Sequence, residues 1–379
     1  PLGKIPEAVD KLIGEFSHQE ENDSINDLKE LLLKTKFNIG KIIFQIKTIR
    51  DTLSSMAKEH NFSMLYNKKR QLFAIGYDVE KDTLGKNYYD LLASEARQAS
   101  FVAIAKGEVE QSHWFNLGRA MTSVGGGKGL VSWSGTMFEY LMPLIIMKKF
   151  PDTLFSETYE YIVEVQKNYG DKKHIPWGIS ESAYYDFDIN SIYQYKAFGV
   201  PGIGLKRGLT NELVVSPYAS VMALQVDFKN AMDNIKKLIE IKAEGIYGFY
   251  DAIDYTCERL SKGRKSAIVN CFMIHHQGMS FMSLDNVLMG NILQERFHRI
   301  PRVKSVELLL QEKVPKSIIY NREEHSKEAK SLFREENVVG RKYTTAITKT
   351  PETNIISNGN YYLMMTNSGS GYSKRNDGV

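Results

Sequence analysis

Two glutamates in unusual surroundings are the strongest candidates for chemistry. After Tyr88, Glu95 has apolar neighbours three, four and seven positions away, so a helix there would place its carboxyl in an apolar stripe. Such a carboxyl is costly unless it is salt-bridged, turned outward or functional. Glu181 lies in residues 176–188, which we expect to form a loop running into a short helix. A glutamate there either caps the helix or lies at a cleft mouth for catalysis.

Paired carboxyls are the minimum equipment for breaking a glycosidic bond. One protonates the leaving oxygen, and the other attacks the anomeric carbon or activates a water. Glu139 falls in another apolar helical segment and raises the same question. Asp186 and Asp188 either bind sugar hydroxyls or are turn residues.

The aromatic residues suit a sugar-binding cleft. They make up 11% of the chain, and flat rings cover the apolar faces of glucose. Trp114, Trp133 and Trp177 all lie in loop-like contexts. Core packing is the alternative, and it holds for most of the 21 Tyr and 18 Phe.

Other chemistries fit the sequence poorly. Residues 123–129 hold glycines before a lysine but lack the flanking residues of a phosphate loop, so we expect a mobile loop beside the cleft. His275 and His276 are adjacent and would point to different helix faces, which makes a poor metal pair. Each is either a ligand for a substrate hydroxyl or a core histidine. We expect no metal and no cofactor, and no Gly-x-Ser-x-Gly elbow is present.

The composition is that of an ordinary globular protein. The chain has 379 residues, 42% of them hydrophobic and 25% charged, and its net charge of +4 is too small to argue for nucleic acid. No segment reaches the roughly 20 apolar residues that a membrane helix needs. Cys257 and Cys271 favour free, buried thiols in a reducing compartment, so we expect a cytoplasmic domain.

The elements that must position these residues are mostly helical. Helix-periodic sequence covers residues 6–60, and a small hairpin follows at 62–66 and 71–76. Further helices are expected at 88–106, 137–149, 154–168, 217–224, 228–243, 249–259 and 277–297. Long, aromatic-rich loops between them favour an all-helical barrel over a simple bundle. After Pro315, strands expected at 341–348, 354–357 and 361–366, with an Asn358-Gly359 turn, indicate the start of a β-rich domain.

Six ordered motifs are spread along the chain. They are YYDLLASEAR at 88–97, HWF at 113–115, SWSGTMFEYLMP at 132–143, WGISESAY at 177–184, VSPYAS at 215–220 and HHQGM at 275–279. Together they resemble the glucoamylase-like central domain of cyclic β-1,2-glucan synthases. The tail from 355 to 373 looks like the first strands of the phosphorylase-like domain of those synthases.

The resemblance implies a mainly α fold, an (α/α)6 toroid with a small β-hairpin near the N-terminus and a β-rich C-terminal tail. The toroid would span residues 62–315, after a helical segment at 1–61 and before a linker and β-rich start at 316–379. The abrupt chain ends favour a piece excised from a longer protein. The implied parent is an inner-membrane synthase whose glycosyltransferase and phosphorylase-like domains are partners of this one.

The resemblance also implies a transglycosylase, related to β-1,2-glucanases, that closes linear β-1,2-glucan into a ring with retained configuration. Glu95 would be the nucleophile and Glu181 the general acid/base, whose pKa should be raised. Retention ordinarily needs carboxyls about 5–5.5 Å apart, or farther if Glu181 acts through a substrate hydroxyl. The glucan subsites would be lined by Asp90, Arg97, His113, Trp114, Trp133, Glu139, Trp177, Tyr184, Asp186, His275, His276 and Gln277.

Two other functions stay open beside this one. The first is an endo-β-1,2-glucanase, since a related family with a similar toroid hydrolyses the same glucan. A transglycosylase must let a glucan hydroxyl outcompete water at ~55 M, and sequence does not show how dry a site is. The second is a non-catalytic glucan-binding domain, which would keep its affinity when Glu95 is replaced.

Overall fold

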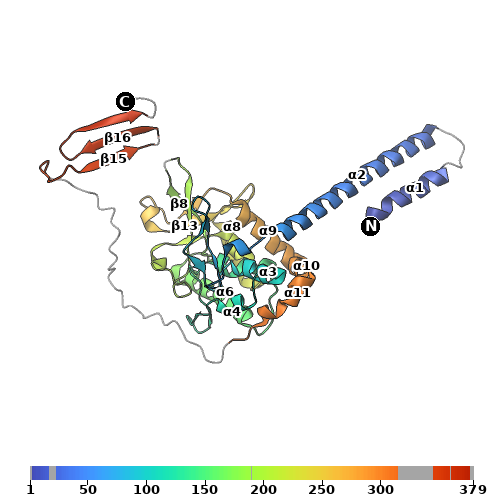
Figure 1. Ribbon diagram of the computed structural model, residues 1–379, viewed down its shortest axis with the longest axis horizontal. Coiled ribbons are helices and arrows are strands. Elements are labelled where there is room, and N and C mark those ends of the chain that lie inside the picture. The colour runs from blue at the N-terminus through green and yellow to red at the C-terminus, as the bar shows by residue number, and fades with distance from the viewer. Residues whose placement is uncertain (1, 17–22, 189, 315–344, 359, 376–379) are drawn as a thin grey trace.

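Helices hold most of the regular secondary structure of this protein (Figure 1). The computed structural model describes residues 2–16, 23–188, 190–314, 345–358 and 360–375. Within these ranges every sheet has two or three strands. The mainly helical character expected from the sequence is therefore confirmed.

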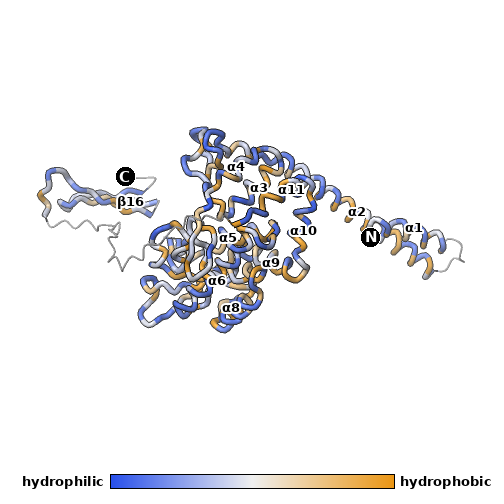
Figure 2. The backbone as a smooth tube through the Cα atoms, turned by 90° about the horizontal axis from the view of Figure 1, so that it is seen from below, coloured by the Kyte–Doolittle hydropathy of each residue, from blue (hydrophilic) through white to orange (hydrophobic). Residues whose placement is uncertain are grey.

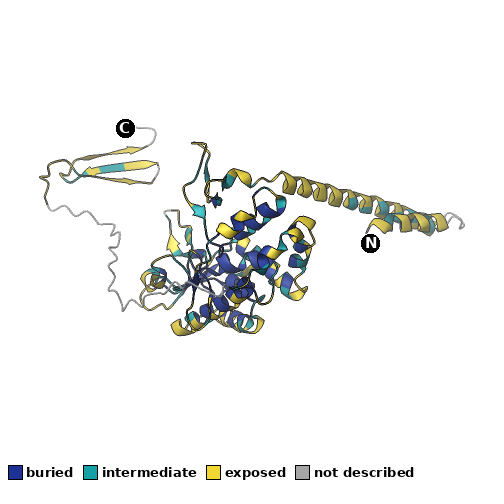
Figure 3. Cartoon of the chain, turned by 60° about the horizontal axis from the view of Figure 1, so that its bottom comes forward, coloured by how far each residue is buried: buried dark blue, intermediate teal, exposed yellow. Residues whose placement is uncertain are grey.

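Two helices precede the main body. α1 (Ile5–Phe16) and α2 (Asp23–Glu59) lie side by side over part of their length, and Lys36 of α2 pairs with Asp10 of α1 at 2.5 Å (Figure 1). No residue of α2 is buried, and Figure 3 shows it exposed along its length. The helical sequence predicted for residues 6–60 is confirmed for the described part.

A small antiparallel sheet follows, with the strand order β1 (Tyr66–Asn67), β2 (Leu72–Ala74) and β5 (Tyr88–Tyr89). A separate ribbon joins β3 (Tyr77–Asp78) to β4 (Thr83–Leu84). The predicted hairpin is confirmed with shorter strands. The helix predicted from residue 88 is wrong in its first part, because β5 pairs with β2 and the helix begins only at Arg97.

The main body is built from helices of very different lengths. They are α3 (Arg97–Lys106), α4 (Ser112–Asn116), α5 (Met137–Leu141), α6 (Leu154–Lys173), α7 (Pro217–Ala223), α8 (Phe228–Glu240), α9 (Ile274–Leu288), α10 (Ile292–His298) and α11 (Pro301–Ser305). Short 3-10 turns lie at Pro143–Ile145, Leu209–Asn211, Cys257–Arg259 and Glu307–Gln311. The helices predicted at 154–168, 217–224 and 228–243 are confirmed by α6, α7 and α8.

Two other predicted helices are interrupted. The one at 137–149 ends at Leu141 and continues as a 3-10 turn from Pro143, a residue that has no backbone N–H to donate. The one at 277–297 divides into α9 and α10. Between them Gly290 and Asn291 adopt positive φ angles of 64° and 60°, which end a right-handed helix.

Short strands replace helices in two places. The segment 249–259, predicted as a helix, contains β13 (Ala252–Asp254), which lies between β10 (Val214–Val215) and β14 (Ala267–Val269). Glu181 leads not into a helix but into β8 (Ser182–Phe187), which pairs with β9 (Tyr193–Lys196). The remaining ribbons join β6 (Met121–Thr122) to β7 (Gly129–Leu130) and β11 (Glu244–Gly245) to β12 (Gly248–Phe249).

One large apolar core runs through the main body, from Leu92 to Leu310. In the hydropathy-coloured tube, apolar and hydrophilic stretches alternate along its helices (Figure 2). The last helices are fastened to the first ones by polar contacts. Arg119 pairs with Glu312 at 2.6 Å, and Gln294 donates to the Leu144 carbonyl at 2.6 Å.

The C-terminal sheet has the order β15 (Thr353–Ser357), β16 (Tyr361–Thr366) and β17 (Gly371–Arg375). The strands predicted at 354–357 and 361–366 are confirmed. Of the strand predicted at 341–348, residues 341–344 lie outside the described residues and 345–348 form no strand. Gly359 of the predicted turn also lies outside them.

Both cysteines are free thiols. Cys271 is half-buried, but Cys257 is exposed, so the expected burial is wrong for that residue. Among the described residues, no helix has the length and apolar character needed to cross a membrane.

Candidate active site

Glu95 is half-buried in the turn that leads into α3. Its carboxyl accepts a hydrogen bond from Ser94 Oγ at 3.1 Å. Arg97 is buried beside this turn. It donates to the carbonyls of Ser94 at 2.9 Å and Glu139 at 2.8 Å. Arg97 also donates to the Tyr140 carbonyl at 2.5 Å. This arginine therefore fixes the turn that carries Glu95 against α5.

Glu181 is half-buried at the start of the β8–β9 hairpin. Tyr218 Oη on α7 donates to the Glu181 carbonyl at 2.9 Å and lies 2.8 Å from Ser180 Oγ. Ser180 Oγ in turn accepts from the backbone N–H of Phe138 on α5, at 3.0 Å. Both glutamates are thus anchored to α5 from different parts of the sequence.

The electrostatics bring the two glutamates into one site. Burial raises the pKa of Glu181, and the negative charge of Glu95 raises it further. A hydrogen bond from Tyr195 opposes this rise in the pKa of Glu181. The charges of Glu95 and Glu181 also both raise the pKa of Tyr89, after burial as the main cause. The charge of Glu95 thus reaches Glu181, and both carboxyls act on the same phenol, so the two glutamates face one site.

Glu139 is buried and forms the capping box of α5. Its carboxyl accepts from Ser132 Oγ at 2.7 Å, from the Ser134 N–H at 3.0 Å and from the Thr136 N–H at 3.0 Å. Burial raises the pKa of Glu139, with a smaller contribution from the charge of Glu95. Its bonds hold the loop 132–136 in shape beside the site.

Trp133 stands on that loop and is 48% exposed. Its indole Nε1 donates to Asp90 Oδ1 at 2.8 Å, so two predicted subsite residues are brought together. The loop is joined to residues 199–206: Lys206 N–H donates to the Trp133 carbonyl at 2.8 Å. A Cβ added at Gly199 would lie 1.7 Å from the Ser134 carbonyl oxygen, so the two loops are in backbone contact.

Three other predicted subsite residues are buried in the body. Trp114 and Trp177 are core residues, 0% and 3% exposed. His113 Nδ1 lies 2.8 Å from the Gln71 carbonyl and His113 Nε2 lies 2.8 Å from Ser100 Oγ. Together with Arg97, these residues support the site from inside rather than offering surface to a sugar.

The β8–β9 hairpin carries two more predicted residues. The Tyr184 ring is half-buried and has the charged groups of Lys196 and Arg259 over it, each 4.8 Å from its centroid. Asp186 is exposed farther along the strand. Asp188 Oδ1 accepts from the backbone of Asn190 and Ile192, so this residue shapes the turn.

The histidine pair begins α9 beside the hairpin. His275 is exposed and His276 is buried, yet both Nε2 atoms approach Tyr195 Oη, at 3.2 Å and 3.3 Å. His276 Nδ1 lies 2.6 Å from Asp251 Oδ1. Gln277 Nε2 donates to the Phe249 carbonyl at 2.7 Å.

Sequence reasoning missed Tyr195 and Asp251. Neither belongs to a motif with a chemical reading, and they come from β9 and from the residue before β13. The sequence holds one indirect clue to Asp251. It lies next to the apolar pair Ala252-Ile253, and an aspartate buried with such a pair needs a polar partner.

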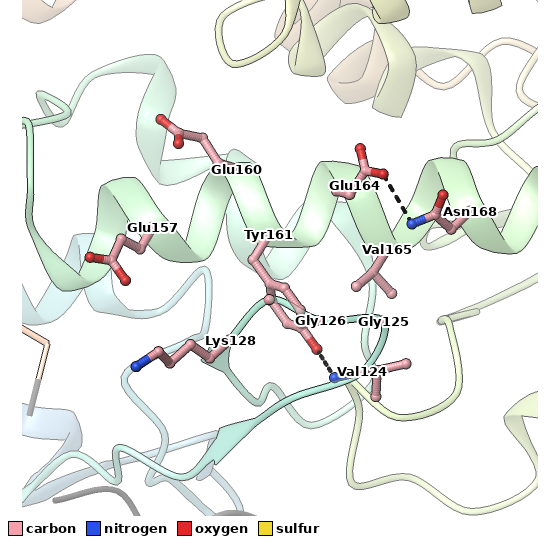
Figure 4. A pocket seen from close by; sticks show the side chains of 11 residues that line it. Val124, Gly125, Gly126, Lys128, Glu157, Glu160, Tyr161, Glu164, Val165 and Asn168 are labelled. Atoms are coloured by element: carbon pink, nitrogen blue, oxygen red, sulfur yellow. Dashed lines mark hydrogen bonds between the residues drawn. The ribbon is translucent and has the colours of Figure 1, made fainter.

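The glycine-rich segment 123–129 forms the connection between β6 and β7 and lies against α6 (Figure 4). Val124 N–H donates to Tyr161 Oη at 2.6 Å. Between them is a cavity of about 400 Å³, lined also by Lys128 and by Glu157, Glu160 and Glu164. It contains none of the candidate site residues, so we do not assign the proposed chemistry to it.

Glu181, Tyr195 and His276 form a hydrogen-bonding group that can hold and move a proton near a second carboxyl, that of Glu95. Such a pair suits cleavage or transfer of a glycosidic bond. Within the described ranges, no three histidine, cysteine, aspartate or glutamate side chains are grouped so as to hold a metal ion.

Comparison with known proteins gives matches on both sides of residue 315. Residues 87–301 match the Glycoamylase family model, described as "Putative glucoamylase". Residues 336–379 match the supersandwich domain of glycosyl hydrolase family 94. The chain is 41% identical over 337 residues to cyclic beta-(1,2)-glucan synthase NdvB of Rhizobium meliloti (strain 1021). That match covers 88% of this chain but only 12% of the longer relative.

Two solved structures are similar. A "putative glucoamylase" from Bacteroides uniformis ATCC 8492 aligns with a TM-score of 0.50 and 12% identity, over 79% of this chain and 68% of that one. A beta-1,2-glucanase from Parabacteroides distasonis aligns with a TM-score of 0.45 and 15% identity, over 79% and 43%. At such identities the first likeness shows a shared fold and nothing finer.

Proposed function

Because the chain belongs to the Glycoamylase family, we propose that it catalyses anomer-retaining transglycosylation of linear β-1,2-glucan to cyclic β-1,2-glucan. The observation that supports chemistry on a glycosidic bond is the raised pKa of Glu181, caused by burial and by the charge of nearby Glu95. The substrate class is supported by the likeness to a protein named cyclic beta-(1,2)-glucan synthase.

The proposal extends to the architecture. In it residues 62–315 form an (α/α)6 toroid, residues 1–61 a helical segment before it, and residues 316–379 the start of a phosphorylase-like domain. The match of residues 336–379 to a family 94 supersandwich domain supports the assignment of the last part. The domain would work on the cytoplasmic side, beside the glycosyltransferase and phosphorylase-like domains of a larger inner-membrane synthase.

The first half-reaction uses both carboxyls. Glu95, as carboxylate, attacks the anomeric carbon while Glu181 gives its proton to the leaving glycosidic oxygen, directly or through a substrate hydroxyl. The bond to the reducing-end fragment breaks, and the remaining glucan is held as an ester on Glu95. The exposed ring of Trp133, oriented by Asp90, offers a face on which a glucose unit can stack.

The second half-reaction reverses the proton flow. Esterification removes the negative charge of Glu95, which is one of the causes that raise the pKa of Glu181. Glu181 then remains ionised more readily and takes the proton from the hydroxyl at the far end of the same glucan. That oxygen attacks the anomeric carbon, frees Glu95 and closes the ring.

Mass spectrometry of the products from linear β-1,2-glucan tests the proposal. We expect products lighter by one water with no rise in reducing ends, and a loss of roughly 100- to 10,000-fold in rate for Glu181→Gln. Glu258→Gln, at an exposed position, is the matched control. New reducing ends would show a hydrolase instead. Glucan binding without turnover by the wild type would show a binding domain.

Azide separates the roles of the two glutamates. With an activated aryl glycoside, Glu181→Ala plus azide should give a glycosyl azide of retained configuration, because the nucleophile is intact. Glu95→Ala plus azide should give the inverted azide. The opposite pattern would exchange the two roles while keeping the pair.

A further inference from the structure

We propose that Asp251, His276 and Tyr195 form a hydrogen-bonded chain whose terminal hydroxyl changes partner, between Glu181 and His276, as Glu181 loses and gains its proton. The inference rests on the proposed acid/base function of Glu181. It assigns Asp251 and His276 as positioning residues and Tyr195 as the group that meets the catalytic carboxyl.

The inner end of the chain is fixed by Asp251, whose side chain is fully buried. Its Oδ1 lies 2.6 Å from His276 Nδ1, and its Oδ2 accepts from the Ala183 N–H at 2.7 Å. Ser216 Oγ donates to its carbonyl at 2.5 Å. A carboxylate can only accept, so His276 Nδ1 carries the hydrogen of this contact, and in the proposed chain Nε2 carries none and is an acceptor.

The middle of the chain is held by stacking. The His276 ring lies 3.8 Å from the Tyr218 ring, at an angle of 12°. Tyr218 also donates to the Glu181 carbonyl at 2.9 Å. One tyrosine thus orients both the imidazole and the backbone of the catalytic carboxyl, which fixes their relative position.

The outer end is Tyr195, on the strand opposite β8. Its hydroxyl lies 3.3 Å from His276 Nε2 and hydrogen-bonds to the Glu181 carboxyl. Burial and the charge of Glu181 raise the pKa of Tyr195, so the phenol keeps its proton at neutral pH. The phenol has one hydrogen and three neighbours, the Glu181 carboxyl, His276 Nε2 and, at 3.2 Å, His275 Nε2, and it can donate to only one of them at a time.

The change of partner follows because the single hydroxyl hydrogen of Tyr195 can serve only one acceptor. When Glu181 is ionised, Tyr195 donates to the carboxylate. When Glu181 is protonated, its own hydrogen is needed at the glycosidic oxygen, and the phenol turns its hydrogen to the bare Nε2 of His276. In both protonation states of Glu181 the Tyr195 hydroxyl then has an acceptor for its hydrogen. Asp251, His276 and Tyr195 neither gain nor lose a proton.

Several charged or titratable groups face Glu181 and contribute to its protonation. They are Glu95 before α3, Tyr89 on β5, Tyr195 on β9, Lys206 on the 199–206 loop, Tyr218 on α7 and His276 on α9, and His275 contacts Tyr195. Among the effects of these groups on Glu181, the proposed partner change alters only the hydrogen bond from Tyr195.

Tyr195→Phe is the first test, with glucan turnover measured against pH. Loss of the donor to ionised Glu181 should move the alkaline limb of the profile to higher pH and lower kcat by about 10- to 100-fold, with little change in KM. Tyr193→Phe is the matched control, because Tyr193 lies on the same strand and its ring lies 4.6 Å from Phe187. We expect it to behave as the wild type.

Asp251→Asn should act in the opposite direction. The asparagine no longer demands a hydrogen on Nδ1, so the His276 hydrogen can move to Nε2 and donate to Tyr195. Tyr195 is then locked toward Glu181, the ionised carboxyl is favoured, and the alkaline limb moves to lower pH. Opposite shifts for the two variants are a result that general damage to the site does not produce.

One test uses the wild-type protein, so its result does not depend on whether a variant folds. Nitrogen-15 NMR of labelled histidines, with His276 assigned from the spectrum of His276→Gln, should show the hydrogen on Nδ1. A hydrogen on Nε2 in the wild type would overturn the inference.

The outcomes separate the inference from the function on which it rests. If the wild type cyclises glucan while Tyr195→Phe matches Tyr193→Phe in kcat and in its alkaline limb, the inference fails and the function stands. If the wild type leaves linear glucan unchanged, both fail.

Discussion

At Glu181, the surroundings that suit acid/base chemistry work against the stability of the fold. Burial and the Glu95 charge raise the pKa of Glu181 above its ordinary value of 4.5. The folded state therefore binds the proton of Glu181 more tightly than the unfolded state does. Stability is fully present below about pH 4.5, falls as pH rises toward the folded pKa, and stays lower above it.

Glu181→Gln should therefore stabilise the protein while it removes activity. At pH 8 we expect a rise in Tm of about 2–4 °C, since ~1 kcal/mol gives such a shift in a domain of this size and solvent screening limits the energy. The difference from the wild type should vanish below pH 4.5. Thermal melts from pH 4 to pH 8 measure it, with Glu258→Gln as control. A variant less stable than the wild type at pH 8 would contradict the electrostatic argument.

The residues of the site differ in how far the sequence reveals them. Glu95 and Glu181 stay predictions that rest on their motifs, because the helix expected to place Glu95 in an apolar stripe begins only at Arg97 and Glu181 leads into a strand. Trp133 cannot be told from Trp114 by sequence, since residue type does not show which ring is exposed. Asp251 and Tyr195 become partners of His276 only where three elements meet in space, and the sequence does not show which residues meet there.

Among the elements, long amphipathic helices are the ones that the sequence predicts well. α6 and α8 have the expected apolar faces, and Thr153 and Ser156 form a capping box at the start of α6. The failures are short segments whose partners are distant in sequence. β5 is a strand because β2 is beside it, and β13 because β10 and β14 flank it.

The contact between loops 132–135 and 199–206 determines where Trp133 and Lys206 stand. Val200 N–H donates to the Gly135 carbonyl at 3.2 Å, and Ser132 N–H donates to the Ile203 carbonyl at 3.1 Å. Such an approach of two backbones is open only to glycine at position 199.

Gly199→Ala should therefore destabilise the protein by about 2–3 kcal/mol or more, because the added Cβ meets backbone that cannot rotate away. Urea unfolding followed by circular dichroism measures the change. Gly76→Ala is the matched control, since a Cβ there meets nothing within 4 Å. Equal stability of the two variants would show that the loops separate easily.

For the whole molecule, the distribution of burial separates the N-terminal helices from the catalytic body. α2 is 37 residues long and contributes no buried residue, whereas the core cluster runs from Leu92 to Leu310. The division predicted from the sequence at residue 61 agrees with this distribution, although the domain limits themselves stay a prediction. The toroid, too, stays a proposal, because short helices and long loops obscure its repeats in the sequence.

Removing residues 1–59 should leave the body intact. We expect Tm to change by no more than about 2 °C and glucan turnover to stay within about twofold, because α2 has no buried residue and the buried Val9 of α1 is not part of the core of the body. His60 must be kept, since its carbonyl accepts from Lys106. Calorimetry of the shortened and full chains gives the comparison. A fall of more than 5 °C would show that α2 supports the body.

The contacts between the first and last parts of the body also limit when it can fold during synthesis. Arg119 and its partner Glu312 are 193 positions apart, and Gln294 is 150 positions from Leu144. A ribosome adding about 5–20 residues per second makes Arg119 roughly 10–40 s before Glu312. Until α10 and α11 have been made, the apolar faces of the early helices that they cover stay exposed. Slow codons between positions 290 and 312 would lengthen this exposure without altering a single amino acid.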